Sequence, residues 1–324
     1  MAVVKANGYG HGLVATAKAL DAADGLAVAR LQEALTLRES GIDQRLLLLA
    51  TLLGTSDLET CARHDIDVVA HDAHSLNTIL TQARATPLRV WLKLDSGMHR
   101  AGLDPSEFRR ADALLRAHKG VVELIHMTHF ASAGDESSRA RQLECFMQCH
   151  AVNPDAPMST ANSAALIACA DTRQQWVRPG IMLYGVNPLL GKSDVRLRPT
   201  MTMASYVISI RNIVAGESVG YDGRWTSTRA SRIGTIGIGY GDGYPRHARN
   251  GTPILIRDRI VPLAGTVSMD SLMVDLTDHD DIAVGDEAIL WGNRLPASVI
   301  AEHSGTIPYD LLACVTDRVM RVYL

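Results

Sequence analysis

A lysine near the start of the chain stands where a short apolar run ends. Lys5 follows three apolar residues and precedes three glycines, Gly8, Gly10 and Gly12, which surround Tyr9. A lysine in this place either stays solvated or points into a pocket, where a desolvated amine loses its proton and forms a Schiff base with an aldehyde. Because glycines let the backbone approach a bound group closely, they favour the second interpretation.

Three charged residues, Lys93, Asp95 and Arg100, stand in and just after a second apolar run at 88–94. Taken singly, each has the ordinary explanation of an ion pair at a strand end. A role in binding therefore needs support from other parts of the chain.

Two pairs of histidines, His126 with His129 and His71 with His74, have a spacing of three. The first pair lies in an expected strand at 122–129. Residues three apart in a strand face opposite sides of the sheet, so we expect no metal shared between them and no metal site. His129, at the strand end, is expected to face a ligand, and no role is assigned to the other pair.

The elements that must position these residues alternate over the first 185 residues between short apolar runs and segments of helical period. This alternation predicts repeated βα units around a parallel sheet. Two helix starts carry recognisable caps: Ser56 with Glu59 forms a capping box, and Asp104 precedes a first-turn proline. Eight such units predict a (β/α)8 TIM-like barrel rather than an open doubly wound sheet. The expected strands are 2–5, 26–29, 46–50, 67–70, 88–94, 122–129, 157–160 and 176–185.

In such a barrel the loops after the seventh and eighth strands commonly bind a phosphate, because free backbone N–H groups point at it. Asn162 and Ser163 open a helix after the seventh expected strand, and Gly180 lies by the eighth. A lysine at one strand end and a phosphate site across the barrel mouth together indicate pyridoxal 5′-phosphate, which needs an amine for its aldehyde and a site for its phosphate.

The pattern changes after Asn187 and Pro188, where a polar connection without periodicity begins. We expect a barrel domain at 1–190 that binds the cofactor and a mainly β domain at 191–324. A glycine-rich run at 234–243 invites comparison with a dinucleotide loop, but Pro245 follows and no helix opens, which excludes that interpretation. The expected elements of this domain are strands at 203–210, 232–238, 254–256, 261–263, 272–276 and 287–291, and helices at 297–303 and 309–315.

The composition is that of a globular enzyme, with 47% hydrophobic and 21% charged residues and a formal net charge of −3. No Lys/Arg block could follow a phosphate backbone, so we expect no nucleic-acid partner. The longest apolar stretch, at 46–53, is far too short to span a bilayer, and no signal peptide is visible, so we expect a cytoplasmic protein without a membrane partner. Five cysteines without a paired spacing are expected to be reduced and buried.

The run Val-Val-Lys-Ala-Asn-Gly-Tyr-Gly-His-Gly at 3–12 resembles the cofactor-attachment signature of alanine racemases, a family of fold-type III pyridoxal-phosphate enzymes. The resemblance extends in order through almost the whole chain. It includes residues 93–102, 128–130, 162–163, 177–185, 219–221, 239–246 and 268–270.

The resemblance implies a two-base racemase that interconverts L-alanine and D-alanine and supplies D-alanine for peptidoglycan. Lys5 would hold the cofactor and act as one base. Tyr221 would be the second base, reaching the opposite face of the substrate from the other subunit of a homodimer with shared active sites. Racemisation requires two such bases, since the proton leaves one face and returns on the other.

By the same resemblance, Arg178 would lie against the pyridine nitrogen of the cofactor. A guanidinium only donates hydrogen bonds, so it would keep that nitrogen unprotonated and weaken the ring as an electron sink. His129 would link this arginine to the tyrosine base. The implied cofactor-binding residues are Lys5, Tyr9, His129, Asn162, Ser163, Arg178, Gly180 and Ile181.

The resemblance places a small amino-acid substrate between the two subunits. Arg100 and the backbone N–H of Met269 would bind its carboxylate. Lys93 matches a lysine that is carbamylated in family members, which would turn a cation into an anion able to hold Arg100.

The chain departs from the family pattern at 314–318, where many members carry a tyrosine that reaches the phosphate. The family also has a segment before the lysine strand. Here that strand begins at Met1, so we expect either a barrel that tolerates this start or a shortened form of a longer sequence.

Other functions share part of this pattern. A broad-specificity amino-acid racemase has the same fold, whereas a decarboxylase of this fold would carry an acidic residue in place of Arg178. A non-catalytic pyridoxal-phosphate carrier protein lacks a second β domain, so residues 200–324 and Tyr221 argue against it. A barrel without a cofactor would require the signature at 3–12 to be a coincidence.

Overall fold

The structure is a computed structural model that describes residues 1–49, 54–82, 87–189 and 191–324. The chain forms two compact units. The first consists of Met1–Gly8, Gly12–Leu183 and Asn187–Arg196, and the second of Tyr9–His11, Tyr184–Val186 and Leu197–Leu324.

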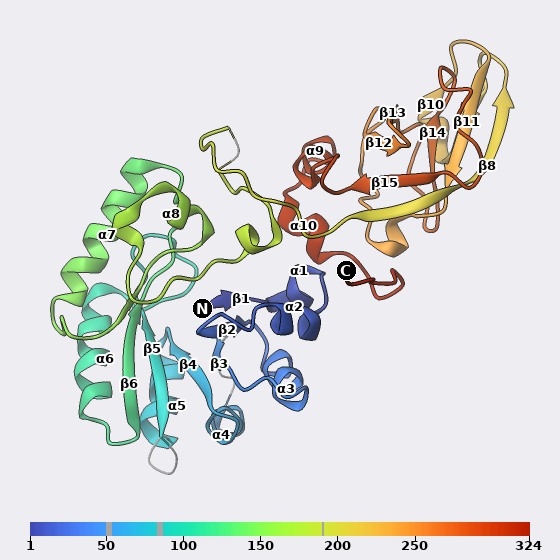
Figure 1. The fold of residues 1–324 in the computed structure, drawn as a ribbon. Coiled ribbons are helices and arrows are strands. Elements are labelled where there is room, and N and C mark those ends of the chain that lie inside the picture. Colours follow the sequence, from blue (N-terminus) through green and yellow to red (C-terminus); the bar gives the residue numbers. More distant parts are fainter. Residues whose placement is uncertain (50–53, 83–86, 190) are drawn as a thin grey trace. The chain divides into compact units, whose positions relative to one another are not determined.

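Seven parallel strands form the sheet of the first unit in chain order, and helices α3 to α7 cover its outer face (Figure 1). The strands are β1 (Ala2–Val3), β2 (Gly25–Val28), β3 (Arg45–Leu48), β4 (Ile66–Ala70), β5 (Leu88–Lys93), β6 (Val121–Met127) and β7 (Met158–Ser159). The helical segments are α1 (Lys5–Tyr9), α2 (Leu13–Ala19), α3 (Leu31–Glu39), α4 (Thr55–Arg63), α5 (Ala73–Gln82), α6 (Pro105–Ala117), α7 (Glu136–His150), α8 (Ser163–Ala168), η1 (Ala170–Thr172) and η2 (Ile181–Tyr184).

The eighth strand, expected at 176–185, is not a regular strand. Its first residues are extended and join the two ends of the sheet: Arg178 donates its backbone N–H to Ala161 at 2.9 Å, and Val3 donates to Pro179 at 2.9 Å. Pro179 has no N–H with which to continue a ladder. The barrel expected from the sequence is therefore confirmed as an architecture, but a short segment of irregular backbone occupies its eighth position.

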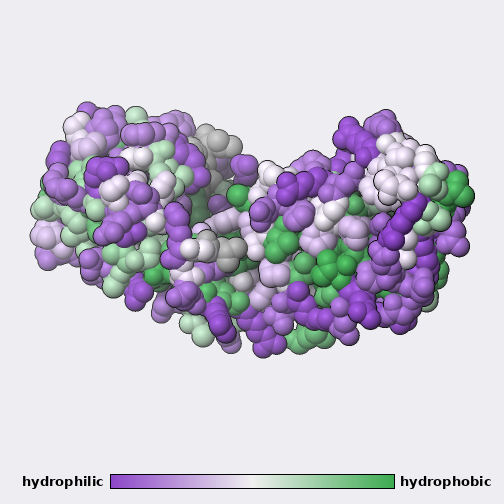
Figure 2. Space-filling model, turned by 90° about the horizontal axis from the view of Figure 1, so that it is seen from above, coloured by the Kyte–Doolittle hydropathy of each residue, from purple (hydrophilic) through white to green (hydrophobic). Residues whose placement is uncertain are grey.

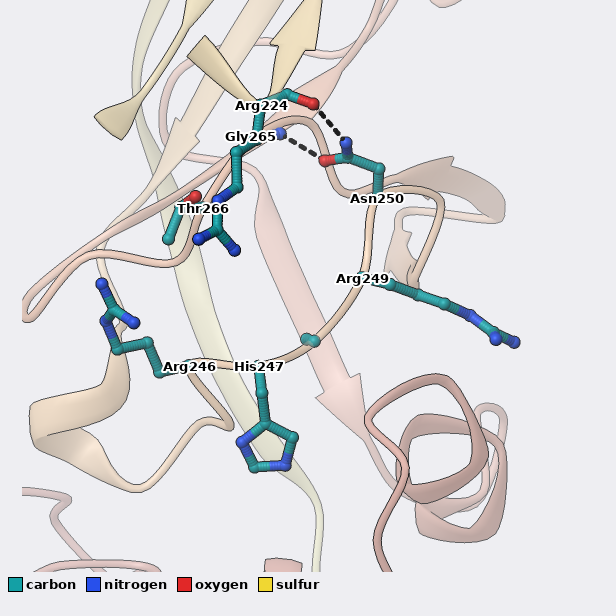
Figure 3. Close-up of a pocket in the computed structure, with 8 residues that line it drawn as sticks. Arg224, Arg246, His247, Arg249, Asn250, Gly265 and Thr266 are labelled. Carbon is teal, nitrogen blue, oxygen red and sulfur yellow. Dashed lines mark hydrogen bonds between the residues drawn. The ribbon is translucent and has the colours of Figure 1, made fainter. Parts of the chain in front are cut away.

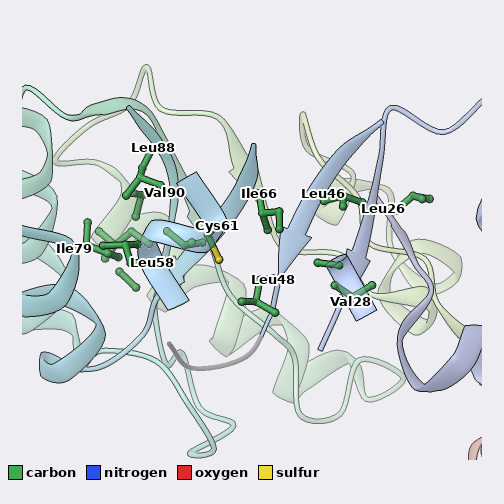
Figure 4. Close-up of a cluster of buried hydrophobic side chains, with 14 of the residues drawn as sticks. Leu26, Val28, Leu46, Leu48, Leu58, Cys61, Ile66, Ile79, Leu88 and Val90 are labelled. Atoms are coloured by element: carbon green, nitrogen blue, oxygen red, sulfur yellow. The ribbon is translucent and has the colours of Figure 1, made fainter. Parts of the chain in front are cut away.

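Alternate residues of the strands build the core between the sheet and the helices (Figure 4). Leu46 and Leu48 of β3 share a cluster with Leu58 and Cys61 of α4 and with Ile79 of α5, and all five are buried. Side chains two apart in a strand face the same side, so one set faces the helices. The sheet is thus buried on its outer face by apolar packing, as a parallel sheet requires.

One of the two expected helix caps is confirmed. The carboxylate of Asp104 accepts hydrogen bonds from the N–H groups of Ser106 and Glu107 at 2.7 and 2.8 Å, and α6 begins at the next residue, Pro105. The expected capping box at Ser56 is wrong, because α4 begins at Thr55 and its N-cap, Gly54, has no side chain that could cap the helix.

The second unit is mainly antiparallel β-structure, as expected. Six strands lie in the order β13-β12-β15-β8-β11-β14, and β9 pairs with β10 in a separate two-stranded ladder that the sequence did not predict. The elements are β8 (Met203–Ile213), β9 (Ser218–Val219), η3 (Tyr221–Gly223), β10 (Trp225–Thr226), β11 (Ser231–Ile236), η4 (Tyr240–Asp242), β12 (Pro253–Ile256), β13 (Arg259–Pro262), β14 (Leu272–Asp275), β15 (Glu287–Trp291), α9 (Ala297–His303) and α10 (Pro308–Ala313).

The surface is mixed, with hydrophilic residues dominating the face seen in Figure 2. Among the described residues, no helix combines the length and the apolar character that crossing a membrane requires. All five cysteines are free, as expected, but only Cys61 and Cys149 are buried, and Cys314 is exposed, so the expectation of uniform burial is wrong.

Candidate active site

The residues singled out in the first unit gather at the carboxyl ends of the parallel strands. Lys5 comes two residues after β1, Lys93 ends β5, and His129 comes two residues after β6. Asn162 follows β7, and Arg178 lies in the segment that closes the barrel. In barrels of this kind the carboxyl ends of the strands meet at one mouth, which is where ligands bind.

The lysine that follows β1 begins a turn of unusual backbone. Ala6, Asn7 and Tyr9 have positive φ angles between 51° and 55°, a left-handed conformation that L-residues rarely adopt. Two contacts hold the turn: Glu33 accepts the backbone N–H of Ala6 at 2.7 Å, and the side chain of Asn7 accepts the N–H of Leu13 at 2.8 Å. Such strain persists only where surrounding contacts fix it and is commonly found at functional sites.

The glycines after Lys5 make their close approaches to the chain itself. A Cβ on Gly10 would lie 1.8 Å from the carbonyl oxygen of Leu312, and one on Gly8 would lie 2.5 Å from the hydroxyl of Thr16. Gly8 and Gly10 therefore have a packing role, since only glycine leaves room for these neighbours.

A group of cations lies around the barrel mouth. Burial and the charges of Arg178, Arg100 and Lys5 together lower the pKa of Lys93 to about 8, against an opposing effect of Asp95. Burial also lowers the pKa of Lys5, with Arg100 acting in the same direction. These four positive charges therefore lie close enough to destabilise one another, which a bound anion would relieve.

The carboxylate nearest in sequence, Asp95, raises the pKa of Lys93 but forms no ion pair with it among the described residues. Asp95 accepts the backbone N–H groups of Gly97, Met98 and His99 at 3.0 Å each, and its second oxygen faces the His99 ring at 3.1 Å. In the described part of the chain neither Lys93 nor Arg100 forms an ion pair, so the ordinary explanation of a strand-end ion pair is wrong for both.

Arg178 is buried and firmly held. Its guanidinium donates to the carbonyl of Ser159 at 2.8 Å, to the hydroxyl of the same serine, and to the carbonyl of Thr128. A guanidinium has five N–H donors, so these three contacts leave two for a ligand. Burial and the Arg178 charge lower the pKa of His129 to about 3, which keeps that imidazole neutral.

Two loops expected to bind a phosphate are joined directly. The hydroxyl of Ser163 accepts the backbone N–H of Gly180 at 2.8 Å, and that of Met182 at 3.4 Å. Asn162 caps α8 by accepting the N–H of Ala165 at 3.0 Å, and its amide lies 3.5 Å from the ring of His129. Ile181, which follows Gly180 in the sequence, is buried and begins η2.

The two histidines spaced three apart do face opposite ways. His126 is fully buried behind the strand, with its ring nitrogens 3.0 Å from Asp112 and 3.0 Å from His150. Within the described residues, no group of three or more His, Cys, Asp or Glu side chains is arranged to hold a metal ion.

In the second unit, Tyr9 lies in an aromatic group that the sequence did not predict. Its ring stacks on that of Tyr184 with centroids 4.6 Å apart, and the ring of Tyr309, in α10, lies 6.1 Å away. Sequence reasoning missed Tyr309. It lies in the first turn of α10, five residues before the segment 314–318.

Tyr221 and Met269 are surface residues of the second unit. Their exposed fractions are 67% and 52%. The Thr266 hydroxyl contacts the carbonyl of Tyr221 at 3.4 Å, and Gly241 donates its N–H to the carbonyl of Met269 at 2.9 Å. Both side chains are therefore free to meet a ligand or a partner.

The described residues fit a ligand with a phosphate and an aldehyde. Lys5 offers an amine whose pKa is lowered, the cation group at the mouth suits an anion, and the hydroxyl of Ser163 has a hydrogen to donate while its oxygen accepts Gly180.

Comparisons with known proteins agree over the whole chain. A family model described as "Alanine racemase, N-terminal domain" matches residues 1–188, and one described as "Alanine racemase, C-terminal domain" matches residues 200–323. The alanine racemase of Photobacterium profundum is 45% identical, over 100% of this chain and 92% of the relative. The alanine racemase of Vibrio cholerae is 46% identical, over 100% of this chain and 91% of the relative.

Solved structures of alanine racemases also match this chain over its full length. The biosynthetic alanine racemase of Pseudomonas aeruginosa superposes with a TM-score of 0.95 at 44% identity, covering 100% of this chain and 92% of that one. The alanine racemase of Streptomyces lavendulae gives a TM-score of 0.90 at 32% identity, covering 100% and 90%. With both family models matched in order and relatives aligned over the full chain, this chain belongs to the alanine racemase family.

Proposed function

We propose that this protein is a pyridoxal-phosphate-dependent racemase that interconverts L-alanine and D-alanine. The observation that carries the proposal is the grouping of Lys5, Lys93, Arg100 and Arg178 at the barrel mouth, where burial lowers the pKa of the Lys5 amine. An amine that loses its proton readily, among cations that favour an anion, suits an aldehyde that carries a phosphate.

Residues of the first unit would hold this cofactor. Lys5 would form the covalent link, and Ser163 would donate its hydroxyl hydrogen to the phosphate while accepting Gly180. Asn162, Gly180 and Ile181 would shape the same loop. When bound, the cofactor supplies an aldehyde for amines and a ring that withdraws electrons from the substrate α-carbon.

A tyrosine at the phosphate is proposed in place of the one missing at 314–318. Tyr309 lies within ring contact of Tyr9, the residue implied as a phosphate ligand. Burial raises the pKa of both phenols, so both remain protonated and able to donate a hydrogen bond to an anion. Tyr309 therefore joins Tyr9 as a cofactor-binding residue in this proposal.

The proton would move between two side-chain atoms on opposite faces of the substrate. Lys5 Nζ would take the α-proton of D-alanine, and Tyr221 Oη that of L-alanine. A single base would return the proton to the face it came from, so inversion requires both. The lowered pKa of Lys5 favours the neutral amine, the form that a proton acceptor requires.

Arg178 and His129 would orient the cofactor ring. The two unused donors of Arg178 would meet an unprotonated ring nitrogen, since a guanidinium accepts no hydrogen bond. His129, neutral because its pKa is about 3, would pass a hydrogen bond from this arginine towards the tyrosine base.

The substrate carboxylate would bind Arg100 and the backbone N–H of Met269. Arg100 is exposed and, in the described part of the chain, without an ion pair. Lys93 would carry a carbamate, because a lysine with a pKa of about 8 presents the neutral amine that reacts with carbon dioxide. The resulting anion would sit among the cations at the mouth.

The active site would be shared in a homodimer. Residues 1–190 would bind the cofactor, and residues 191–324 would present Tyr221 and Met269 to the partner subunit, which fits the exposure of both side chains. The enzyme would act in the cytoplasm and supply D-alanine for peptidoglycan. A broad-specificity amino-acid racemase is the alternative. Assays on serine and valine enantiomers distinguish it from an enzyme specific for alanine.

The central test is Lys5→Ala beside Lys18→Ala, an exposed lysine on the following helix. The unaltered protein and Lys18→Ala should absorb in the violet, lose the band on borohydride reduction and racemise alanine. Lys5→Ala should lack both the band and racemisation. A borohydride-fixed cofactor on any other lysine would contradict the assignment.

A further inference from the structure

The segment at 321–323 lies against the turn that follows Lys5. Arg321 donates its Nε–H to the carbonyl of Gly10 at 2.8 Å, and the Tyr323 hydroxyl donates to the carbonyl of His11 at 2.9 Å. The partners are 311 and 312 residues apart in the sequence, yet all four residues belong to the second unit. The proposed reaction gives neither Arg321 nor Tyr323 a role.

Arg321 is anchored on its other side as well. A second nitrogen of its guanidinium donates to the carbonyl of Val315 at 3.1 Å, two residues after α10 ends. The side chain is mostly buried, with 18% of it exposed, whereas the carboxylate of Asp317, 3.5 Å away, is exposed and adds little. The guanidinium thus ties Gly10 to the chain that follows α10.

Three successive carbonyls of the turn accept hydrogen bonds from side chains. Besides those of Gly10 and His11, the carbonyl of Tyr9 lies 2.9 Å from Nδ1 of the His11 ring. The other ring nitrogen of His11 lies 2.9 Å from the Thr200 hydroxyl. Tyr9 and Gly10 have φ angles of 51° and 79°. A left-handed segment that includes a tyrosine keeps this conformation only where surrounding contacts hold it.

A comparable tie joins two other loops of the second unit. The side chain of Asn250 donates to the carbonyl of Arg224 at 2.9 Å and accepts the N–H of Gly265 at 2.8 Å (Figure 3). One side chain there bonds to both loops, as Arg321 bonds to both Gly10 and Val315. Bonds of this kind fix irregular backbone before a ligand binds, which lowers the conformational entropy lost on binding.

We propose that Arg321 and Tyr323 are positioning residues that hold Tyr9 for the cofactor phosphate. The inference rests on the proposed function, in which the Tyr9 phenol donates a hydrogen bond to that phosphate. The Tyr9 ring is buried and stacks on Tyr184 with centroids 4.6 Å apart. A shift of the backbone at 9–11 would disturb this stacking and move the phenol hydroxyl away from its ligand.

The test compares pyridoxal 5′-phosphate with pyridoxal, which lacks the phosphate, by measuring the dissociation constant of each for the full chain after removal of its cofactor. Arg321→Leu should weaken binding of pyridoxal 5′-phosphate by about tenfold, the worth of one charge-assisted hydrogen bond. Tyr323→Phe removes a neutral hydrogen bond and should weaken it by about threefold. Neither change should alter the affinity for pyridoxal, because the lost contact is with the phosphate.

Two matched controls come from the same unit. Arg294 is an exposed arginine that also donates to a backbone carbonyl, that of Arg257, and Tyr206 is an exposed tyrosine of β8. Arg294→Leu and Tyr206→Phe should bind both ligands as the unaltered protein does.

Hydrogen exchange gives a readout that does not depend on the cofactor. The backbone N–H of Gly12 donates to the carbonyl of Asn7 at 2.8 Å across the turn. In the cofactor-free protein, peptides that cover 6–16 should exchange faster in Arg321→Leu and Tyr323→Phe than in the unaltered chain and the two controls. Unchanged exchange in both variants would mean that these side chains do not hold the turn.

The outcomes separate this inference from the proposed function. Equal weakening of pyridoxal 5′-phosphate and pyridoxal binding would show a structural role only and overturn the inference, as would an equal loss in Arg294→Leu. Unchanged affinity in both variants, with the unaltered chain binding pyridoxal 5′-phosphate, would overturn the inference and leave the proposed function standing. If the unaltered chain bound no pyridoxal 5′-phosphate, the proposed function would fail and this inference with it.

Discussion

The Ser163 hydroxyl accepts the backbone N–H of Gly180 at 2.8 Å, and this bond joins the loop after β7 to the segment that closes the barrel. Both residues are buried. The bond leaves the hydroxyl hydrogen of Ser163 as the donor for a phosphate and occupies the N–H of Gly180. The Ser163 side chain therefore holds the two segments together and offers a hydrogen bond to a phosphate.

Ser163→Ala should weaken cofactor binding by about tenfold, because it removes a donor to a charged group and leaves the Gly180 N–H without its acceptor. Equilibrium titration of the cofactor-free protein measures the dissociation constant. Ser137→Ala, an exposed serine of α7 whose hydroxyl contacts only Asp135, should bind as the unaltered protein does. Equal affinities for all three proteins would remove Ser163 from the phosphate site.

Lys93 should take up carbon dioxide in a pH-dependent way. Its pKa of about 8 means that the neutral amine becomes the major form as pH rises through 8, and only that form makes a carbamate. With carbon-13-labelled bicarbonate, a carbamate signal should be stronger at pH 8.5 than at pH 6.5. It should disappear in Lys93→Ala and persist in Lys119→Ala, which changes an exposed lysine. A signal that survives Lys93→Ala lies on another amine.

Tyr221→Phe should separate exchange from inversion. The change removes the phenol hydroxyl and little volume, so Lys5 should still exchange the α-proton of D-alanine with heavy water. Inversion should fall by on the order of a thousandfold, as expected when a general base is lost. The rate of α-proton exchange is measured as deuterium incorporation into each enantiomer at early times. Tyr206→Phe, another exposed tyrosine of the second unit, should behave normally. Normal exchange of L-alanine by Tyr221→Phe would leave the second base to another residue, with Tyr240 and Tyr244 the next to test.

Mixing two inactive variants should restore activity if the site is shared between subunits. A dimer of one Lys5→Ala chain and one Tyr221→Phe chain retains one site with both bases. Random reassembly makes half the dimers mixed, which gives about a quarter of the original activity. Co-expression with two affinity tags allows the mixed dimer to be isolated and assayed. An inactive mixed dimer would mean that Tyr221 acts within its own chain.

Acid should destabilise the fold through a buried cluster between α6, β6 and α7. Asp112 accepts hydrogen bonds from Arg116, His126 and Asn153 at 2.8, 3.0 and 3.1 Å. Burial alone would raise its pKa, but these hydrogen bonds lower it, and burial lowers the pKa of His150. Both groups bind protons more readily when unfolded, so stability is lost as pH falls, below about 6.5 for the histidine and below about 4 for the carboxylate.

Asp112→Asn tests this assignment by urea unfolding between pH 7 and pH 3. At pH 7 it should lower the free energy of unfolding by about 3 kcal/mol, because it breaks a buried pair. The difference from the unaltered protein should narrow below about pH 4. Asp278→Asn removes an exposed ion pair with Arg229 and should leave the free energy of unfolding nearly unchanged at any pH. An equal loss from Asp112→Asn at pH 3 would mean that packing, not charge, explains its effect.

Local chemistry let the sequence alone predict much of this protein. Apolar runs predicted the seven regular strands of the barrel within a few residues, and Asp104 before Pro105 predicted the start of α6. Both signals depend on residues within one turn or strand of each other, where spacing and capping chemistry act directly. The motif at 3–12 indicated the family in the same way, because its residues are contiguous.

Contacts between distant residues were decided only in the tertiary structure. Pro179 pairs with Val3 and so replaces an eighth strand, and Tyr309 comes within ring contact of Tyr9 across 300 residues. Gly10 packs against Leu312. Asp95 accepts the backbone N–H groups of its own loop instead of forming an ion pair with a cation at the mouth. No local period or spacing encodes these contacts, because they depend on how the whole chain closes on itself, and that closure decides which charges remain free for a ligand.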